Sequence, residues 1–202
     1  MNKKYSFILI LLLTTFVSVQ AQTKKGQFAI SADFGASLMS WEWQVMTSPA
    51  VNYKAPPAYQ GIVDYALIDK LSIGGAFSYQ KVSSINRGYT YVNTLGQKVT
   101  EDVVNSLTRM NFSYRILFHY VGTDKIDVYS GIRMGLNYYQ DSHTSNDLNY
   151  KLQTNELFQG FGFAPQVIGL GIRMYIFQDL AINTEIAVGF PSFFNFGLTY
   201  RM

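Results

Sequence analysis

Residues 109–120 read RMNFSYRILFHY, and this stretch decides the fold class. Apolar or aromatic side chains occupy every even position from Met110 to Tyr120, whereas most of the odd positions are polar. Successive side chains of a β-strand point to opposite faces, so this alternation predicts a strand with one apolar and one polar face. Two charged residues, Arg109 and Arg115, fall on the polar face.

The same period of two returns seven more times along the chain. We expect eight strands, over residues 28–38, 59–67, 71–79, 109–120, 127–138, 168–176, 180–188 and 194–201. Short connections at 69–70, 122–125 and 178–179 alternate with long ones at 41–57, 83–105 and 141–159, and the last connection, at 191–192, is brief. Short turns at one end and longer loops at the other are typical of an antiparallel up-and-down barrel.

The volume of the two faces predicts which one lies inside. The interior of a closed eight-stranded barrel is just wide enough for side chains to fill, or to hold one small ligand. The apolar face offers roughly five bulky residues per strand, too many for that lumen by the same size argument, whereas the other face is rich in Gly, Ala and Ser. The sequence therefore predicts an all-β, eight-stranded antiparallel transmembrane barrel whose apolar face contacts lipid. Both termini would lie on the periplasmic side.

The N-terminus has the three parts of a secretory signal. Lys3 and Lys4 form a positive region, residues 7–17 an apolar run, and residues 19–21, VQA, a small-residue cleavage site. The apolar run is shorter than the roughly 20 residues that a spanning helix needs. We expect residues 1–21 to be a cleaved signal peptide and residues 22–202 to form one outer-membrane barrel domain.

Composition removes several classes of function. The chain has 16 Lys and Arg against 13 Asp and Glu, with no basic cluster, so no nucleic-acid partner is expected. It has no Cys, which excludes disulfides, thiol catalysis and lipid attachment through a cysteine. His119 has no His, Cys or carboxylate at metal spacing, and we interpret it as a hydrogen-bonded structural residue. No metal and no cofactor are expected.

The last residues, 194–202, read FNFGLTYRM. Together with the signal peptide and the eight alternating strands, they resemble the small outer-membrane β-barrel proteins similar to OmpA and OmpX, especially those of Bacteroidetes. In that family the terminal strand serves as a signal to the barrel-assembly machinery, and the matching positions here are Phe196, Leu198, Tyr200 and Met202, with Met202 replacing the commoner Phe. The resemblance implies outer-membrane lipids and lipopolysaccharide as surroundings, and an unknown extracellular ligand.

Seven charged residues are expected to point into the lumen. Charges buried in this way need partners, and Arg173 and Glu185 lie diagonally across one predicted hairpin. We expect these charges to form a packed plug of ion pairs, and an ion-selective channel lining is the alternative. The seven are Asp33, Asp64, Arg109, Arg115, Arg133, Arg173 and Glu185.

One further constellation has catalytic composition. His143 and Ser145 are separated by one residue, and Glu156 follows; a serine, a histidine and a carboxylate are the parts of a serine hydrolase. The run resembles the His-x-Ser-Asn run of outer-membrane lipid A deacylases, but it falls in a predicted polar loop rather than on a late strand. We expect a structural or surface-interaction protein that acts through its loops and is not an enzyme. A narrow pore and a lipid A esterase are the alternatives.

Overall fold

The structure is a computed structural model that describes residues 23–37, 39–40, 52–123, 125–147, 149–150 and 160–202. The predicted signal peptide, residues 1–21, lies outside the described residues. The strands are β1 (Phe28–Ala36), β2 (Asn52–Lys54), β3 (Ala58–Ile68), β4 (Leu71–Val92), β5 (Lys98–Gly122), β6 (Ile126–Thr144), β7 (Gly160–Tyr175), β8 (Leu180–Gly189) and β9 (Phe194–Arg201).

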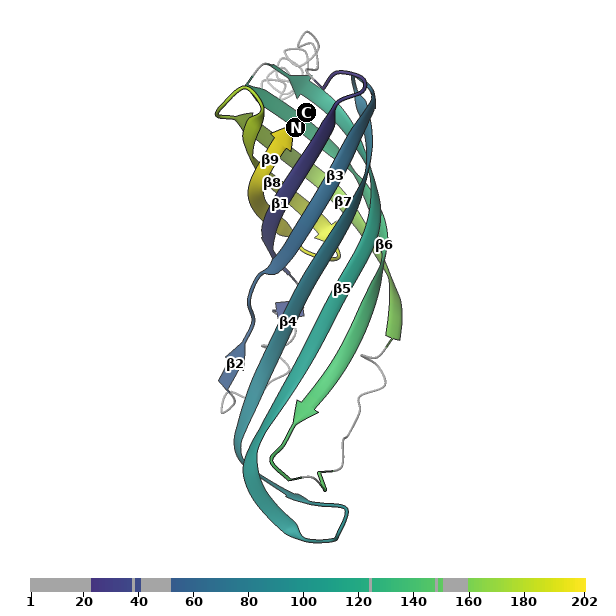
Figure 1. Ribbon diagram of the computed structural model, residues 1–202. Helices are drawn as coiled ribbons and strands as arrows, with labels where there is room; N and C mark the ends of the chain where they lie inside the picture. The colour runs from purple at the N-terminus through teal and green to yellow at the C-terminus, as the bar shows by residue number, and fades with distance from the viewer. Residues whose placement is uncertain (1–22, 38, 41–51, 124, 148, 151–159) are drawn as a thin grey trace, which may run out of the picture.

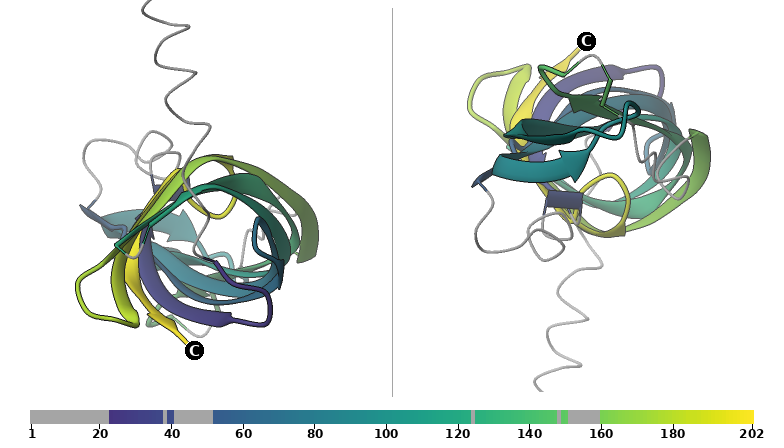
Figure 2. Two further views of the ribbon diagram at one scale, coloured as in Figure 1. Left: turned by 90° about the horizontal axis from the view of Figure 1, so that it is seen from above. Right: turned by 90° about the horizontal axis from the view of Figure 1, so that it is seen from below.

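Eight of these strands close into a barrel. The strands pair in the order β4-β3-β1-β9-β8-β7-β6-β5, every pair is antiparallel, and β4 also pairs with β5 to close the ring (Figures 1 and 2). The short β2 pairs with β4 outside this ring. The predicted all-β, eight-stranded antiparallel up-and-down barrel is confirmed. Within the described residues, no helix is both long and apolar enough to cross a membrane.

The faces of the strands are as predicted. Outward residues such as Ile30 and Phe112 are 45% and 60% exposed, whereas inward neighbours such as Ser31 and Asn111 are buried. Ile168 is an exception, because we expected it on the outward face and it is buried inside the barrel. A β-bulge between Ile168 and Leu170 shifts the register and reverses the face of the residues on one side.

The two ends of the barrel differ. The start of β1, the end of β9 and the β3–β4, β5–β6 and β7–β8 turns lie at one end, which we call the terminal end (Figure 1). At the opposite end β4, β5 and β6 continue beyond the other strands (Figure 1); β6 pairs with β5 as far as Thr144, and the β4–β5 hairpin reaches farther, to Val92 and Lys98. We call this projecting part the extension. The prediction of a loop over 83–105 is therefore wrong for most of its length, because these residues form the outer part of the β4–β5 hairpin.

The extension is built from ordinary strand and turn chemistry. β-branched residues pair across it at Ile85 and Val104, and the hydroxyls of Thr90 and Thr100 are 2.8 Å apart. At its tip the Asn93 side chain accepts hydrogen bonds from two backbone N–H groups, and Gly96 takes a φ of +78°. Polar residues at 83–88 interrupt the apolar alternation, and for this reason the pattern predicted a loop.

The connection between β6 and β7 is also shorter than predicted. β6 continues to Thr144 and β7 begins at Gly160, eight residues before the expected start of that strand at 168. Pro165 is tolerated within β7 because the pairing with β8 ends at Gln166. No backbone N–H of residue 165 is therefore needed for the β7–β8 ladder.

Candidate functional site

The lumen of the barrel contains the densest cluster of charge in the described residues. All seven predicted lumen residues are at most 5% exposed and point inward, and Asp127 joins them. The cluster thus holds four arginines and four carboxylates, so the two signs balance. The arginines are Arg109, Arg115, Arg133 and Arg173, and the carboxylates are Asp33, Asp64, Asp127 and Glu185.

Arg115 on β5 lies at the centre of this network. Its Nε is 3.2 Å from Asp64 Oδ1, and one terminal nitrogen is 2.5 Å from Glu185 Oε1. Glu185 also accepts a hydrogen bond of 2.8 Å from the Tyr129 hydroxyl and lies 3.7 Å from Arg133. Carboxylates buried with several charge-assisted hydrogen bonds stay ionised and hold their partners in place.

Arg173 takes other partners than the one we expected. Its guanidinium contacts Asp64 at 2.6 Å and Asp127 at 3.5 Å, whereas Glu185 pairs with Arg115 and Arg133. Arg173 and Glu185 therefore belong to one network but are joined through Asp64 and Arg115. These ion pairs thus form between strands that face each other across the lumen, not within the β7–β8 hairpin.

Two of the remaining charges, Asp33 and Arg109, bind uncharged polar groups. The Asn183 side chain donates to Asp33 at 3.0 Å, and Arg109 donates to Gln80 at 3.1 Å and to the Pro191 carbonyl at 2.7 Å. Sequence reasoning omitted Asp127 and Tyr129 from the network. The alternation of side chains along the strand already predicted that Asp127 points inward. The role of Tyr129, in contrast, depends on its contacts across the lumen.

Inward glycines make room for these side chains. A Cβ added to Gly74 would meet the carboxylate of Asp64, and one added to Gly197 would meet that of Asp33. Each glycine is directly opposite its aspartate on the neighbouring strand. The small residues of the inward face are thus part of how the charged network packs.

Gly171→Ala is expected to destabilise the barrel by about 1–3 kcal/mol, the usual cost of overpacking a core. A Cβ at this position would overlap the ring of Tyr129, which is wholly buried and bound to Glu185. Gly61→Ala is the matched control, because a Cβ at Gly61 has no heavy atom within 4 Å. Urea unfolding in lipid vesicles measures both variants, and equal stability would contradict the packing described here.

The predicted catalytic constellation is only partly within the described residues. His143 binds Asp141 at 2.9 Å and Asn105 at 2.5 Å, so both ring nitrogens have partners. The Ser145 hydroxyl donates to Glu101 rather than to the histidine. Glu156 lies outside the described residues. Each described member is thus engaged with another group.

Ser145 instead belongs to a brace on the extension. Glu101 on β5 accepts hydrogen bonds from the Ser145 and Tyr91 hydroxyls, and Tyr91 also reaches Asp147 at 3.3 Å. The hydrogen bond from Ser145 contributes most to lowering the pKa of Glu101, followed by the one from Tyr91. Because the pKa is lowered in the folded state, the brace is at full strength at neutral pH and is lost as the pH falls through the range of an ordinary carboxyl and below.

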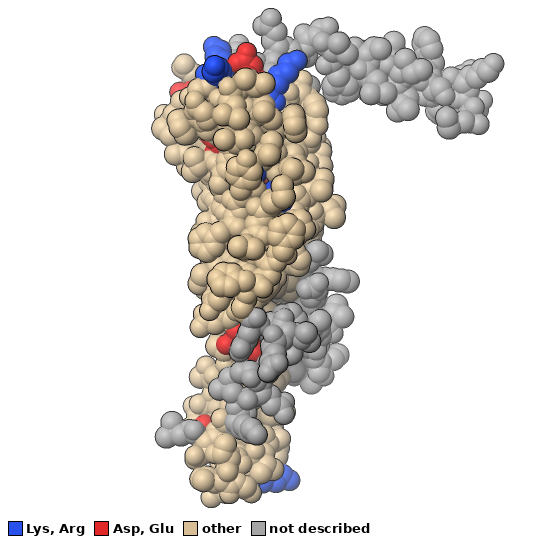
Figure 3. Space-filling view, turned by 90° about the vertical axis from the view of Figure 1, so that its right-hand side faces the viewer, with Lys and Arg blue, Asp and Glu red and all other residues tan. Residues whose placement is uncertain are grey.

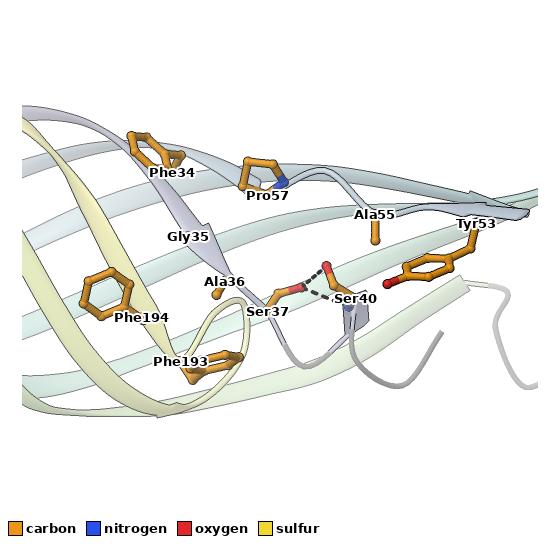
Figure 4. A pocket seen from close by; sticks show the side chains of 10 residues that line it. All are labelled: Phe34, Gly35, Ala36, Ser37, Ser40, Tyr53, Ala55, Pro57, Phe193 and Phe194. Atoms are coloured by element: carbon orange, nitrogen blue, oxygen red, sulfur yellow. Dashed lines mark hydrogen bonds between the residues drawn. The ribbon is translucent and has the colours of Figure 1, made fainter. Parts of the chain in front are cut away.

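A cavity of about 790 Å³ lies at the rim, between the end of β1, the β2–β3 connection and the β8–β9 turn (Figure 4). Its walls are mostly apolar, and the Ser37 and Ser40 hydroxyls, 3.4 Å apart, add a polar side. Phe34 and Phe194 line the cavity and also belong to the exposed outer surface of the barrel. The cavity is therefore continuous with that surface.

The outer surface is apolar around the barrel. On the face shown in Figure 3, charged side chains gather at the terminal end and on the extension, and the broad belt between them is largely uncharged. Residues that are partners on neighbouring strands form a row across this surface, and all but one of them are aromatic: Phe196, Phe34, Tyr59, Tyr79, Met110, Tyr138 and Phe161. The predicted assembly-signal residues lie on the same outer surface: Phe196, Leu198, Tyr200 and Met202. An exposed apolar belt of this size suits hydrocarbon, not water.

A closed barrel with an apolar exterior, a charged interior and short turns at one end defines the class. The chain has the fold of the small eight-stranded outer-membrane β-barrels similar to OmpA and OmpX. Neither a protein-family model nor a curated protein sequence matches it.

Several solved structures of outer-membrane proteins resemble the barrel, among them these three. The outer membrane protein OprG from Pseudomonas aeruginosa has a TM-score of 0.52 at 10% identity, covering 92% of this chain and 99% of OprG. The N-terminal β-barrel domain of Pseudomonas aeruginosa OprF gives 0.43 at 12% identity, over 88% and 98% of the chains. Ail, the attachment invasion locus protein of Yersinia pestis, gives 0.41 at 10% identity, over 88% and 99%. OprG, with the highest TM-score of the three, shares the fold of this chain.

Proposed function

We propose that this chain is an integral protein of the bacterial outer membrane that presents its extension to a partner outside the cell. In this arrangement the terminal end faces the periplasm, lipid and lipopolysaccharide surround the apolar belt, and the barrel-assembly machinery inserts the chain. The observation that carries the proposal is the extension itself. It projects beyond the barrel on three strands and is braced by side-chain hydrogen bonds, whereas the lumen is filled by balanced charges.

The extension offers two features that a macromolecular partner can use. Its tip exposes apolar side chains, with Val92 at 63% and Leu95 at 65% exposure, beside Tyr89. Among the described residues its edges also project past their neighbours, because the pairing of β6 with β7 ends at Tyr139 and the pairing of β2 with β4 covers only residues 83–85. A strand edge of this kind binds an extended peptide through backbone hydrogen bonds.

A shortened chain tests this role. Replacing residues 87–102 by Asn-Gly joins the paired residues Asn86 and Val103 through a two-residue hairpin turn. We expect this variant to insert and fold, because the barrel pairs are untouched, and to abolish adherence of the cells to immobilised host-surface proteins. Cells with the full chain are the control. Equal adherence of both strains would contradict the proposal.

A narrow pore is the second candidate, and one observation favours it. Several buried polar atoms of the lumen, including Asp33 Oδ1, Arg133 Nε and Arg173 Nε, have no hydrogen-bond partner among the described residues. Internal water is the usual partner of such atoms. We expect the packed ion pairs to interrupt any water path, so the purified chain should leave a planar bilayer silent at neutral pH. Reproducible single-channel steps would make the pore the better description.

A further inference from the structure

A serine, a histidine and an aspartate meet inside the terminal end of the barrel. Ser72 on β4, His119 on β5 and Asp127 on β6 are each about 2% exposed and point inward. The Ser72 Oγ is 2.7 Å from His119 Nε2, and the other ring nitrogen, Nδ1, is 2.8 Å from Asp127 Oδ1 and 3.2 Å from the hydroxyl oxygen of Thr23. Ser72 and His119 lie on paired strands, as do His119 and Asp127.

The Ser72 and Asp127 partners of His119 suit a neutral ring with its proton on Nδ1. An ionised carboxylate only accepts, so Asp127 requires the proton on Nδ1 of His119. Nε2 is then the basic nitrogen and accepts from the Ser72 hydroxyl. This is the arrangement by which a histidine, oriented by a carboxylate, removes the proton of a nucleophilic serine.

A cavity next to Ser72 adds two further elements. It has a volume of about 10 Å³, enough for roughly one water molecule, and Ser72 and Arg173 both line it. The Arg173 Nε is buried and has no hydrogen-bond partner among the described residues, so it is available to an oxyanion. Thr23 and Gln27 also line the cavity and are only half-buried, so among the described residues few side chains separate Ser72 from solvent.

We propose that Ser72 is a nucleophile, activated by His119 and Asp127, that accepts acyl groups from small carboxylic esters entering through the terminal end. Because the cavity has room for roughly one water molecule, the acyl group must be as small as acetyl and must displace the half-buried side chains that line the cavity. This site is separate from the extension, and the inference does not depend on the surface role proposed above.

The reaction balances with the groups present. Ser72 Oγ bonds to the carbonyl carbon while His119 Nε2 takes the hydroxyl proton, and the carbonyl oxygen, now negative, lies toward Arg173. The bond to the leaving oxygen breaks, and that oxygen departs with the electron pair and the proton from His119. Water then attacks the acyl-serine, passes its proton through His119 to Ser72, and releases the carboxylic acid.

Acetylation by p-nitrophenyl acetate tests the proposal on the full-length protein folded in detergent micelles. We expect release of p-nitrophenolate and, by peptide mass spectrometry, acetylation of Ser72. Ser72→Ala should abolish this modification, and His119→Gln should slow it by about 100-fold, the lower range for loss of a general base. The matched control is Ser78→Ala, because Ser78 is an equally buried, inward serine of β4 whose hydroxyl has no partner among the described residues.

A second variant tests whether access to Ser72 limits the reaction, without changing the triad. Gln27→Ala removes one wall of the cavity, and the hydrogen bond of the Gln27 side chain goes to the Lys24 N–H rather than to the triad, so this variant should raise the acetylation rate several-fold. Gel mobility without boiling verifies that each variant is folded. The proposal is overturned if Ser72 stays unmodified in both the natural chain and the Gln27→Ala variant, or if folded His119→Gln reacts as fast as the natural chain.

Discussion

Replacing Glu185 by leucine is expected to lower the free energy of unfolding by about 3–5 kcal/mol, as removing one partner of a buried ion pair usually does. Glu185 is wholly buried and binds Arg115 and Arg133. Without it the lumen would hold four arginines against three carboxylates. Urea titration of the chain in lipid vesicles, followed by gel mobility without boiling, measures the loss.

The double variant tests whether the network acts as a unit. Arg115→Met combined with Glu185→Leu restores the balance of charge, so the pair should cost less than the sum of the single changes. The expected coupling energy is about 0.5–3 kcal/mol, the range for residues in one network. The pair Arg201–Asp179, at 3.9 Å, in which the aspartate is exposed and the arginine half-buried, is the control and should couple by less than about 1 kcal/mol. Additive, small effects at Arg115 and Glu185 would mean that the lumen charges are hydrated.

Ile132→Arg is expected to destabilise the barrel by about 2–4 kcal/mol, because it places a charge on the lipid face near the bilayer midplane. Ile132 is 41% exposed on β6 and pairs with Ile116 and Val167, all away from the ends of their strands. Unfolding in lipid vesicles measures the effect.

The same strand provides a matched control. Ile126 is also an outward isoleucine of β6, with 40% exposure, but it is the first residue of the strand, at the terminal end. Ile126→Arg should cost at most about 1 kcal/mol, since the penalty falls near the membrane interface. Equal costs at the two positions would contradict the proposed depth of the barrel in the membrane.

Strand parity predicted most of the barrel, because a side-chain period of two reports which face is packed. It could not predict the bulge that turns Ile168 inward, because an extra residue in one strand leaves no mark in the pattern of types. It also could not predict the extension. Outside a membrane both faces of a ribbon meet water, so the alternation that reveals the barrel strands is absent there.

Parity likewise placed the seven proposed lumen charges, and the structure finds them inside. Their partners depend on which strands lie opposite across the lumen, which a single sequence does not encode in any local pattern. For this reason the sequence did not predict the direct partners of Arg173 and Glu185. The contact of Arg173 with Asp64, 109 residues earlier in the chain, was not foreseen. The meeting of Ser72, His119 and Asp127 was hidden in the same way.

The most direct test of the membrane barrel is the electrophoretic mobility of the chain from the outer-membrane fraction of cells. A closed sheet satisfies its backbone hydrogen bonds internally, so the folded barrel should resist dodecyl sulfate until it is heated. The account predicts recovery in the outer membrane and a shift in mobility between unheated and boiled samples. Recovery as a soluble periplasmic protein, with one mobility before and after boiling, would contradict it.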